Sequence, residues 1–198
     1  MQAGRTDKES IVASTVKERL VASTIELIAT HGVAGTGISE LLEHSKVSRR
    51  SVYLNFPQGK SELVAEATRT VGRRFGAALS GLTPGPMASA VVEFGGLYRG
   101  ILESSGFAMG CPIVAATLGR DEAPDAADAA RDTFAEWVQT LAARLRLDGV
   151  ADAQCEPLAT TIVAAVEGAV IMSIAMRSAQ PLEQAVDQLA VLIRSAAS

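Results

Sequence analysis

Residues 47–63 decide the fold, and they read V-S-R-R-S-V-Y-L-N-F-P-Q-G-K-S-E-L. Ser48 is a good N-cap, because its hydroxyl can accept a hydrogen bond from a free backbone N–H of the following turn. A short helix is therefore predicted from residue 48 to about Asn55. Pro57-Gln58-Gly59 then breaks the chain, and Ser61 caps a long helix that is predicted to run to about Ser80.

Two further helices are predicted before this stretch. The first runs from about Thr15 to His31, with apolar residues recurring on one face, and Gly32 stops it. The second covers residues 38–45 and is followed by a turn at Lys46-Val47. Three short helices joined by tight turns within the first sixty residues are typical of a helix-turn-helix module.

The rest of the chain also has helical periodicity, and no strand-like alternation persists anywhere. Gly, Pro and Asp-rich joints separate five more predicted helices, over 87–104, 112–119, 126–147, 152–177 and 181–196. We therefore expect an all-α protein of about nine helices in two parts. Residues 1–60 form a flexible arm (Met1 to Val12) and a helix-turn-helix head, and residues 61–198 form a larger helical body.

Charge is distributed unevenly along the chain. The formal net charge is −4, but residues 1–64 carry +1 and the remainder carries −5. Between His44 and Ser61 there are four cationic side chains and no carboxylate. This window is where an anionic partner is expected to bind.

The short helix after Ser48 has the features of a DNA-recognition helix. Such a helix carries small or basic residues in its first turn, close to the base edges of the major groove. Val52 and Phe56 share one side of the helical wheel, while Arg50, Ser51 and Leu54 point the other way and Arg49 lies at the leading end. An arginine there can bind a guanine through two hydrogen bonds. Composition alone fits an ordinary solvated basic surface equally well.

The motifs break this tie. From Gly32 the chain reads G-x-x-x-T-x-I-x-x-L-L, and the stretch quoted above follows. This pattern resembles the DNA-binding domain of the TetR family of repressors, whose signature ends in Tyr-x-His-Phe-x-x-Lys. Phe-Pro-x-Gly-Lys at 56–60 and Gly-Cys-Pro at 110–112 are similar to the branch that contains the lincomycin-resistance repressor. Asn55 replaces the usual histidine, and Arg50 replaces a usual glycine of that branch.

The resemblance implies a function as well as a fold. Family members are cytoplasmic homodimers that bind a palindromic operator in double-stranded DNA, and a small-molecule effector in the body releases them. The last two helices would form the dimer interface, and the long helix from Ser61 would move the heads apart. Carried over by position, the DNA-binding residues are expected to be Thr36, Lys46, Ser48, Arg49, Arg50, Ser51, Tyr53, Asn55 and Lys60.

The helix over 152–177 is predicted to be the main dimer contact. It carries small residues that allow two helices to approach closely, and these are Ala164, Ala165, Gly168, Ala169 and Ser173. Packing within one subunit is the alternative interpretation. A membrane span is not expected, because Glu167 interrupts the apolar run and no cluster of Lys or Arg flanks it.

The effector pocket is expected among the large side chains of the body. The candidates are Phe94, Tyr98, Phe107, Met109, Phe134, Trp137, Glu167 and Met172. Ordinary core packing is the alternative for each apolar member. Glu167 is different, because a carboxylate in an apolar helix needs a partner. It is expected to meet a cationic ligand or an arginine such as Arg99 or Arg177.

Catalysis is not expected. Both histidines, His31 and His44, lie in the head without metal-ligand spacing, and the body has no histidine to activate a Cys111 nucleophile. No metal and no cofactor are therefore predicted. The competing interpretation is an architectural or activating DNA-binding protein without an effector. A body of about 130 residues exceeds what dimerisation needs and favours a sensor.

Overall fold

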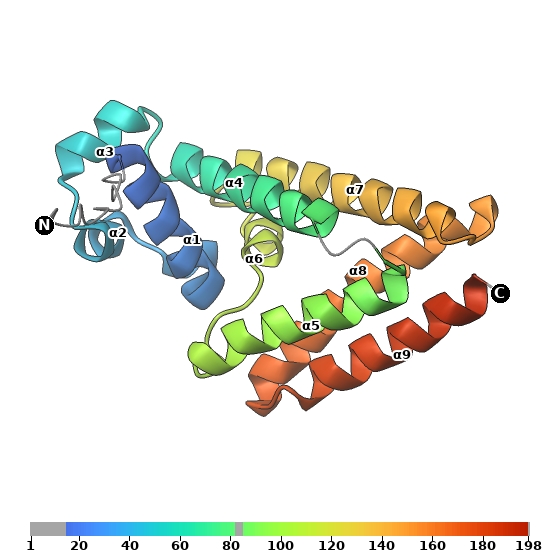
Figure 1. The fold of residues 1–198 in the computed structure, drawn as a ribbon. Coiled ribbons are helices and arrows are strands. Elements are labelled where there is room, and N and C mark those ends of the chain that lie inside the picture. Colours follow the sequence, from blue (N-terminus) through green and yellow to red (C-terminus); the bar gives the residue numbers. More distant parts are fainter. Residues whose placement is uncertain (1–14, 82–84, 198) are drawn as a thin grey trace, which may run out of the picture.

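A computed structural model describes residues 15–81 and 85–197, and all regular structure within them is α-helical. The helices are α1 (Val16–Gly35), α2 (Ile38–Ser45), α3 (Arg49–Asn55), α4 (Lys60–Gly81), α5 (Met87–Ser104), α6 (Pro112–Leu118), α7 (Pro124–Leu147), α8 (Asp152–Met176) and α9 (Gln180–Ala196). The expected all-α fold is confirmed. Helices α1–α3 form a head at one end, and the C-terminus lies at the far end of the body (Figure 1).

Local signals place most helix ends. Thr15 and Glu18 form a capping box at the start of α1, in which each side chain accepts a hydrogen bond from the other's backbone N–H. Gly32 interrupts the helical backbone of α1 with a φ of 71°, and a last turn continues to Gly35. The arm predicted for residues 1–12 lies outside the described residues.

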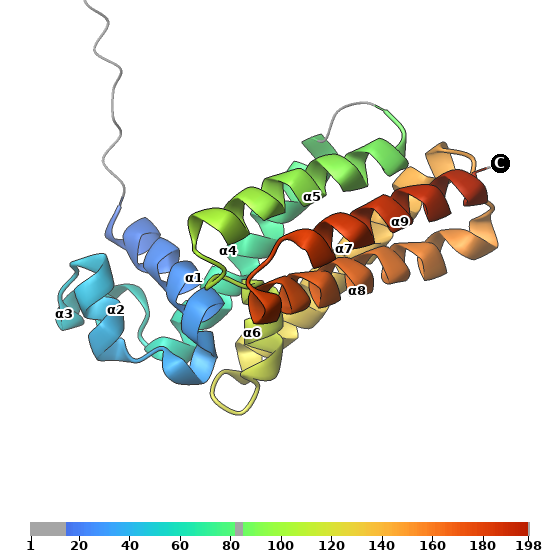
Figure 2. The same ribbon diagram turned by 90° about the horizontal axis from the view of Figure 1, so that it is seen from below.

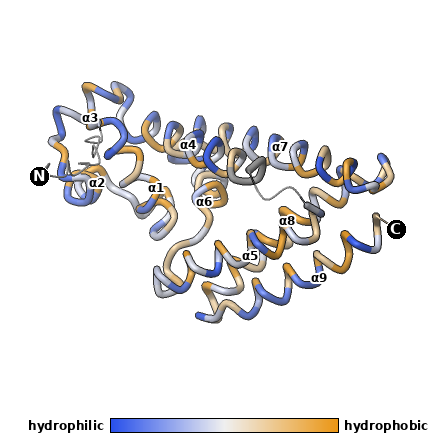
Figure 3. Tube along the Cα trace, in the orientation of Figure 1, coloured by the Kyte–Doolittle hydropathy of each residue, from blue (hydrophilic) through white to orange (hydrophobic). Residues whose placement is uncertain are grey.

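The helices of the body form two layers. Helices α4 and α7 lie side by side in one layer, and α5, α8 and α9 run together in the other (Figures 1 and 2). Polar and apolar turns alternate along α7 and α9 (Figure 3), as expected for helices with one face in a core. The short helix α6 packs against α4 and α7 of the first layer and against α1 of the head.

The apolar cores overlap at the junction of head and body. Leu63 and Ala67 of α4 pack in the head core with Val52 and Phe56 of α3. A second core joins α1, α4, α6 and α7, and a third joins α5, α7, α8 and α9. The domain boundary predicted at residue 60 stays a prediction. The first turns of α4, which follow this boundary, belong to the head core. The same helix continues along the body.

Helix α8 is long and apolar enough to cross a membrane by length and composition, with a mean hydropathy of 1.9 in its best window. It packs against α7 and α9 within the helical body. A core helix of a soluble protein meets the same criteria, so this property is weak evidence for a membrane span.

Candidate DNA-binding surface and effector cavity

The turn between α2 and α3 is fixed by its backbone and its cap. Lys46 ends α2 in the left-handed conformation, with a φ of 55°. The Ser48 Oγ accepts a hydrogen bond from the backbone N–H of Ser51 at 3.2 Å and lies 2.9 Å from the Ser51 hydroxyl. Val52 and Phe56 are buried, so the opposite side of α3 faces solvent. The helix is thereby oriented with its basic turn outward.

The exposed side of α3 keeps its positive charge available. Lys46, Arg49 and Arg50 are exposed, and none of them pairs with a carboxylate among the described residues. Several arginines of the body are paired instead: Arg69, Arg73, Arg99, Arg120, Arg131 and Arg146. A phosphate backbone would therefore meet uncompensated cations at the head.

The remaining polar candidates flank this side. Tyr53 is 46% exposed, and its ring lies against Gly59, where a β-carbon would be 3.2 Å from Cε1 of the ring. Asn55 is half-buried, and its side-chain amide donates to the Ser51 carbonyl at 2.8 Å. Lys60 is half-buried at the first position of α4 and also has no ion-pair partner among the described residues.

Thr36 does not match its expected role. Its side chain is buried, and its hydroxyl donates to the carbonyl of Gly32 at 2.8 Å. Its backbone N–H donates to the Val33 carbonyl. Thr36 therefore stabilises the end of α1 after the break at Gly32 and is not exposed as a phosphate contact.

Leu54 is the exposed residue of α3 that the predicted DNA-binding set omits. It is 71% exposed and lies on the same side as Arg50. A large apolar side chain left in solvent on a recognition helix fits contact with a thymine methyl group. The helical wheel already placed it there, but its apolar character kept it out of a set chosen for polar chemistry.

A cavity of about 40 Å³ lies in the body between α4, α5, α7 and α8. Three aromatic rings form part of its wall. The Phe75 ring of α4 lies between Phe94 of α5, with ring centroids 4.8 Å apart, and Trp137 of α7, at 4.5 Å. The volume suits only a few water molecules, because Phe75 fills the space between the other two rings.

Three of the predicted pocket residues line this cavity, namely Phe94, Trp137 and Glu167. Tyr98 and Phe134 lie behind the wall, with ring centroids 5.9 Å from Phe94 and 5.6 Å from Trp137, respectively. The others are not brought to it: Phe107 packs on the core of α5, α8 and α9, Met109 is half-buried in the α5–α6 connection, and Met172 is exposed. Phe75 was missed because α4 was considered only as the helix that moves the head.

Two polar groups at the cavity lack partners. The Trp137 Nε1–H and the Glu167 Oε2 are both buried without a hydrogen bond among the described residues. Burial raises the pKa of Glu167 to about 7, and contact with the Cys111 thiol opposes this only in part. Burial likewise raises the pKa values of Cys111 and Tyr98, which stay neutral.

Neither arginine proposed from the sequence pairs with Glu167. Arg99 binds Glu103 at 2.8 Å and Glu183 at 2.6 Å on the outer surface. Arg177 caps the end of α8 in the left-handed conformation and is exposed.

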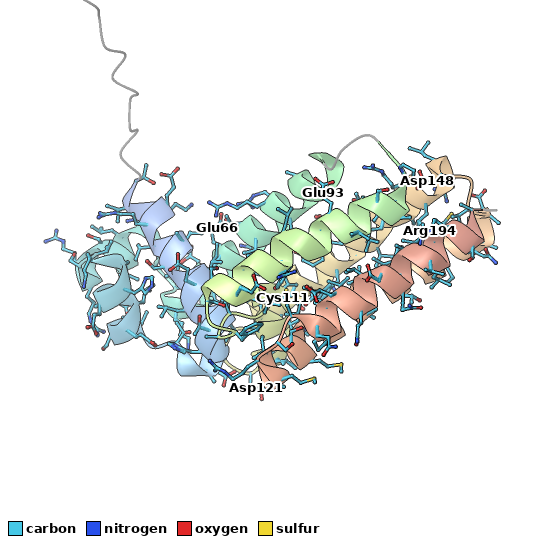
Figure 4. All side chains as sticks on the ribbon, turned by 60° about the horizontal axis from the view of Figure 1, so that its bottom comes forward. Glu66, Glu93, Cys111, Asp121, Asp148 and Arg194 are labelled. Carbon is cyan, nitrogen blue, oxygen red and sulfur yellow. The ribbon has the colours of Figure 1, made fainter. Side chains whose placement is uncertain are left out.

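Glu167 also borders a second, more open hollow of about 330 Å³ between α1, α6 and α8. Glu122 contributes another carboxylate to this hollow. Cys111, at the N-terminus of α6, lines it as well and lies among the helices of the body in Figure 4. Glu167 therefore lines both the body cavity and the hollow at the junction with the head.

A helix-turn-helix head with uncompensated cations, joined to a helical body with an internal cavity, defines a DNA-binding transcription regulator. Residues 20–67 match the family of bacterial regulatory proteins described as the tetR family, and residues 87–188 match the C-terminal domain of LmrA/YxaF-like transcriptional regulators. The chain belongs to the TetR family and carries an LmrA/YxaF-like body. Its family is one of transcriptional regulators and not of enzymes, as predicted.

Individual relatives agree with this assignment. The chain is 32% identical to an uncharacterized HTH-type transcriptional regulator of Mycobacterium tuberculosis over 89% of its length and 93% of that protein. It is 22% identical to the HTH-type transcriptional regulator LmrA of Bacillus subtilis, covering 84% and 90% of the two chains. The fold is similar to that of a TetR transcriptional regulator from Legionella pneumophila, with a TM-score of 0.82, 18% identity, and coverage of 90% and 97%.

Proposed function

We propose that this protein is a cytoplasmic homodimeric repressor that a small molecule releases from a palindromic operator. The observation that carries the proposal is the position of α4. Leu63 of this helix packs in the head core, and the Phe75 ring lines the body cavity in contact with Phe94 and Trp137. One helix therefore contacts both the DNA-reading part and the space that an effector would occupy.

The release step follows from the size of the cavity. A drug-sized molecule needs several hundred Å³, far more than the cavity of about 40 Å³ offers. Its entry must displace the Phe75 ring, and α4 moves with it. Leu63 and Phe75 are twelve positions apart and so about 18 Å apart along the helix, and a shift at one end reaches the head core at the other.

The outer side of α8 supports self-association. A stripe of small and apolar residues, exposed except for the half-buried Gly168, follows steps of four and three residues, as a helix–helix seam requires. Its members are Pro157, Thr161, Ala164, Gly168, Ile171 and Ala175. A β-carbon on Gly168 would meet nothing within 4 Å. In the last helix, α9, Val191 and Leu192 are also about half exposed. We assign this stripe to a two-fold contact with a second copy.

The predicted set of small residues therefore divides between two roles. Ala164 and Gly168 belong to the outer stripe, whereas Ala169 and Ser173 are buried inside the subunit and the half-buried Ala165 packs against the same core.

In the proposed dimer, two copies of α3 enter successive major grooves about 34 Å apart. Arg49, Arg50 and Ser51 face the bases, with Leu54 added to the base-reading side. Lys46, Ser48, Tyr53, Asn55 and Lys60 bind the phosphate backbone.

In-vitro selection of bound duplexes from a random library, at two salt concentrations, tests the proposal. A palindromic consensus is expected, and small molecules can then be screened for its release. An architectural protein would give weak binding without a consensus, and an effector-independent regulator would give a consensus that no compound releases. Either result would overturn the corresponding part of the proposal.

A further inference from the structure

The residues that line the body cavity indicate the charge and polarity of the molecule that would bind there. The residues that line the cavity are apolar except for Glu167 and Trp137, whose Oε2 and Nε1 atoms are buried without a hydrogen-bond partner among the described residues. Among the described residues that line it there is no lysine, arginine or histidine. An anionic effector would therefore meet only an acidic group there, with no cation to compensate its charge.

The aromatic rings and the carboxylate favour the opposite charge. Phe75, Phe94 and Trp137 present ring surfaces to the cavity, and ring faces attract cations that are withdrawn from water. Glu167 supplies the counter-charge in a buried position where ionisation is costly without a partner. Neither arginine considered from the sequence fills this role, because Arg99 is paired with Glu103 and Glu183 and Arg177 is exposed at the end of α8.

Resting on the ligand-responsive function proposed above, we propose that the effector is an apolar amine whose ammonium group binds the Glu167 carboxylate while its hydrocarbon body replaces the Phe75 ring between Phe94 and Trp137. The Trp137 Nε1–H donates to an acceptor oxygen where the amine carries one. Glu167 is the group that selects the charge, and the rings select an apolar body.

The pKa of Glu167 agrees with this assignment. Burial raises this pKa to about 7, so part of the carboxyl groups are protonated near neutral pH. An ammonium group would favour the ionised form. Tyr98 and Cys111, the other titratable groups that face Glu167, stay neutral because burial raises their pKa values.

The protein carries its own reporter, because Trp137 is its one tryptophan and lines the cavity. Three probes share a carbon skeleton and differ in one group: 4-phenylbutylamine, 4-phenylbutanol and 4-phenylbutanoate. Titration of tryptophan fluorescence at pH 8 is expected to give the tightest binding for the amine, about tenfold tighter than the alcohol, and the weakest for the carboxylate.

Two variants locate the contact. In Glu167→Gln, which keeps the shape and removes the charge, the amine is expected to bind about as weakly as the alcohol. In Glu122→Gln, which removes the carboxylate of the neighbouring hollow, the preference for the amine is expected to persist. Circular dichroism checks that both variants fold.

Several results would overturn the proposal. These are equal binding of amine and alcohol to the wild type, an amine preference that survives Glu167→Gln, loss of the preference in Glu122→Gln, or no fluorescence response to any probe up to its solubility limit. Operator release is measured separately. If an amine binds without releasing DNA, the proposed ligand class stands and the proposed release function is overturned. If a non-amine compound releases DNA, the release function stands and the ligand class is overturned.

Discussion

A β-carbon on Gly119, at the end of α6, would lie 2.5 Å from the Cβ of Val33 in α1. The connection between α5 and α6 also contacts α1, since the Gly110 N–H donates to the Ala29 carbonyl at 2.8 Å. Helix α6 therefore packs directly against α1 of the head.

Gly119→Ala is expected to destabilise the protein by about 1–3 kcal/mol, because α1 and α6 must separate to admit the methyl group. Urea denaturation measures the loss. The control is Gly100→Ala on the exposed side of α5, where a β-carbon meets nothing within 4 Å. It should be neutral or stabilise the helix by up to about 1 kcal/mol. Equal effects of the two substitutions would contradict the close contact.

Glu167→Gln is expected to change how stability depends on pH. Burial raises the pKa of Glu167 from 4.5 to about 7. The folded state therefore binds more protons than the unfolded state between these values, and the wild type loses stability as the pH rises from 4.5 to 7. The variant should lack this loss and be more stable at pH 8 by on the order of 3 kcal/mol.

Denaturation midpoints from pH 4 to pH 8 give the comparison. Glu156→Gln, at an exposed position on the same helix, serves as the control. If the wild type and Glu167→Gln keep parallel pH profiles, Glu167 does not ionise at a cost in the folded protein.

Arg49→Ala is expected to weaken operator binding by about 1–3 kcal/mol and to relax the preference at one base pair of each half-site, because it removes a base contact. Titration of the selected operator and its single-base variants measures both effects. Arg131→Ala is the matched control, since Arg131 lies on α7 and pairs with Asp128 and Asp132. Unchanged affinity in Arg49→Ala would remove Arg49 from the base-reading set.

Lys60→Ala is expected to weaken binding to all DNA sequences to a similar degree, because a phosphate contact carries no sequence information. The slope of log affinity against log salt concentration should fall by about one unit. Titrations at four salt concentrations on specific and random duplexes supply the slopes. A loss confined to the operator would instead indicate a base contact.

Gly168→Lys is expected to give a folded monomer. The position is open within one subunit, so the fold tolerates the side chain, whereas a charge on the α8 stripe would face its own copy across the two-fold axis. Sedimentation measures the mass, and circular dichroism checks the helices. A variant that remains dimeric would place the interface elsewhere.

The helices were predictable because their ends carry local signals. Ser48, Gly32 and the proline-glycine breaks mark boundaries through caps and backbone geometry, and these act within a few residues. The predicted start of α7 at residue 126 came two residues late because Pro124, which is favourable in a first turn, was read as part of the joint.

The cavity was only partly predictable, because it depends on contacts between distant helices. Phe94, Trp137 and Glu167 were identified as large or charged residues in apolar helices. Phe75 was not, since nothing in the sequence of α4 indicates that its ring lies between rings from α5 and α7. The predicted phosphate contact of Thr36 is wrong for a related reason. Its hydroxyl donates to the Gly32 carbonyl, and this hydrogen bond depends on the folded turn.

The separation of paired and unpaired cations has a consequence for handling the protein. Six arginines of the body are paired with carboxylates, whereas Lys46, Arg49, Arg50 and Lys60 keep their charge on one end of a molecule with a net charge of −4. We expect the purified protein to adsorb both to an anion-exchange resin, through its acidic body, and to heparin, through its head. Cellular nucleic acid would copurify with it unless salt is raised at lysis, and an absorbance ratio at 260 and 280 nm would reveal the contamination.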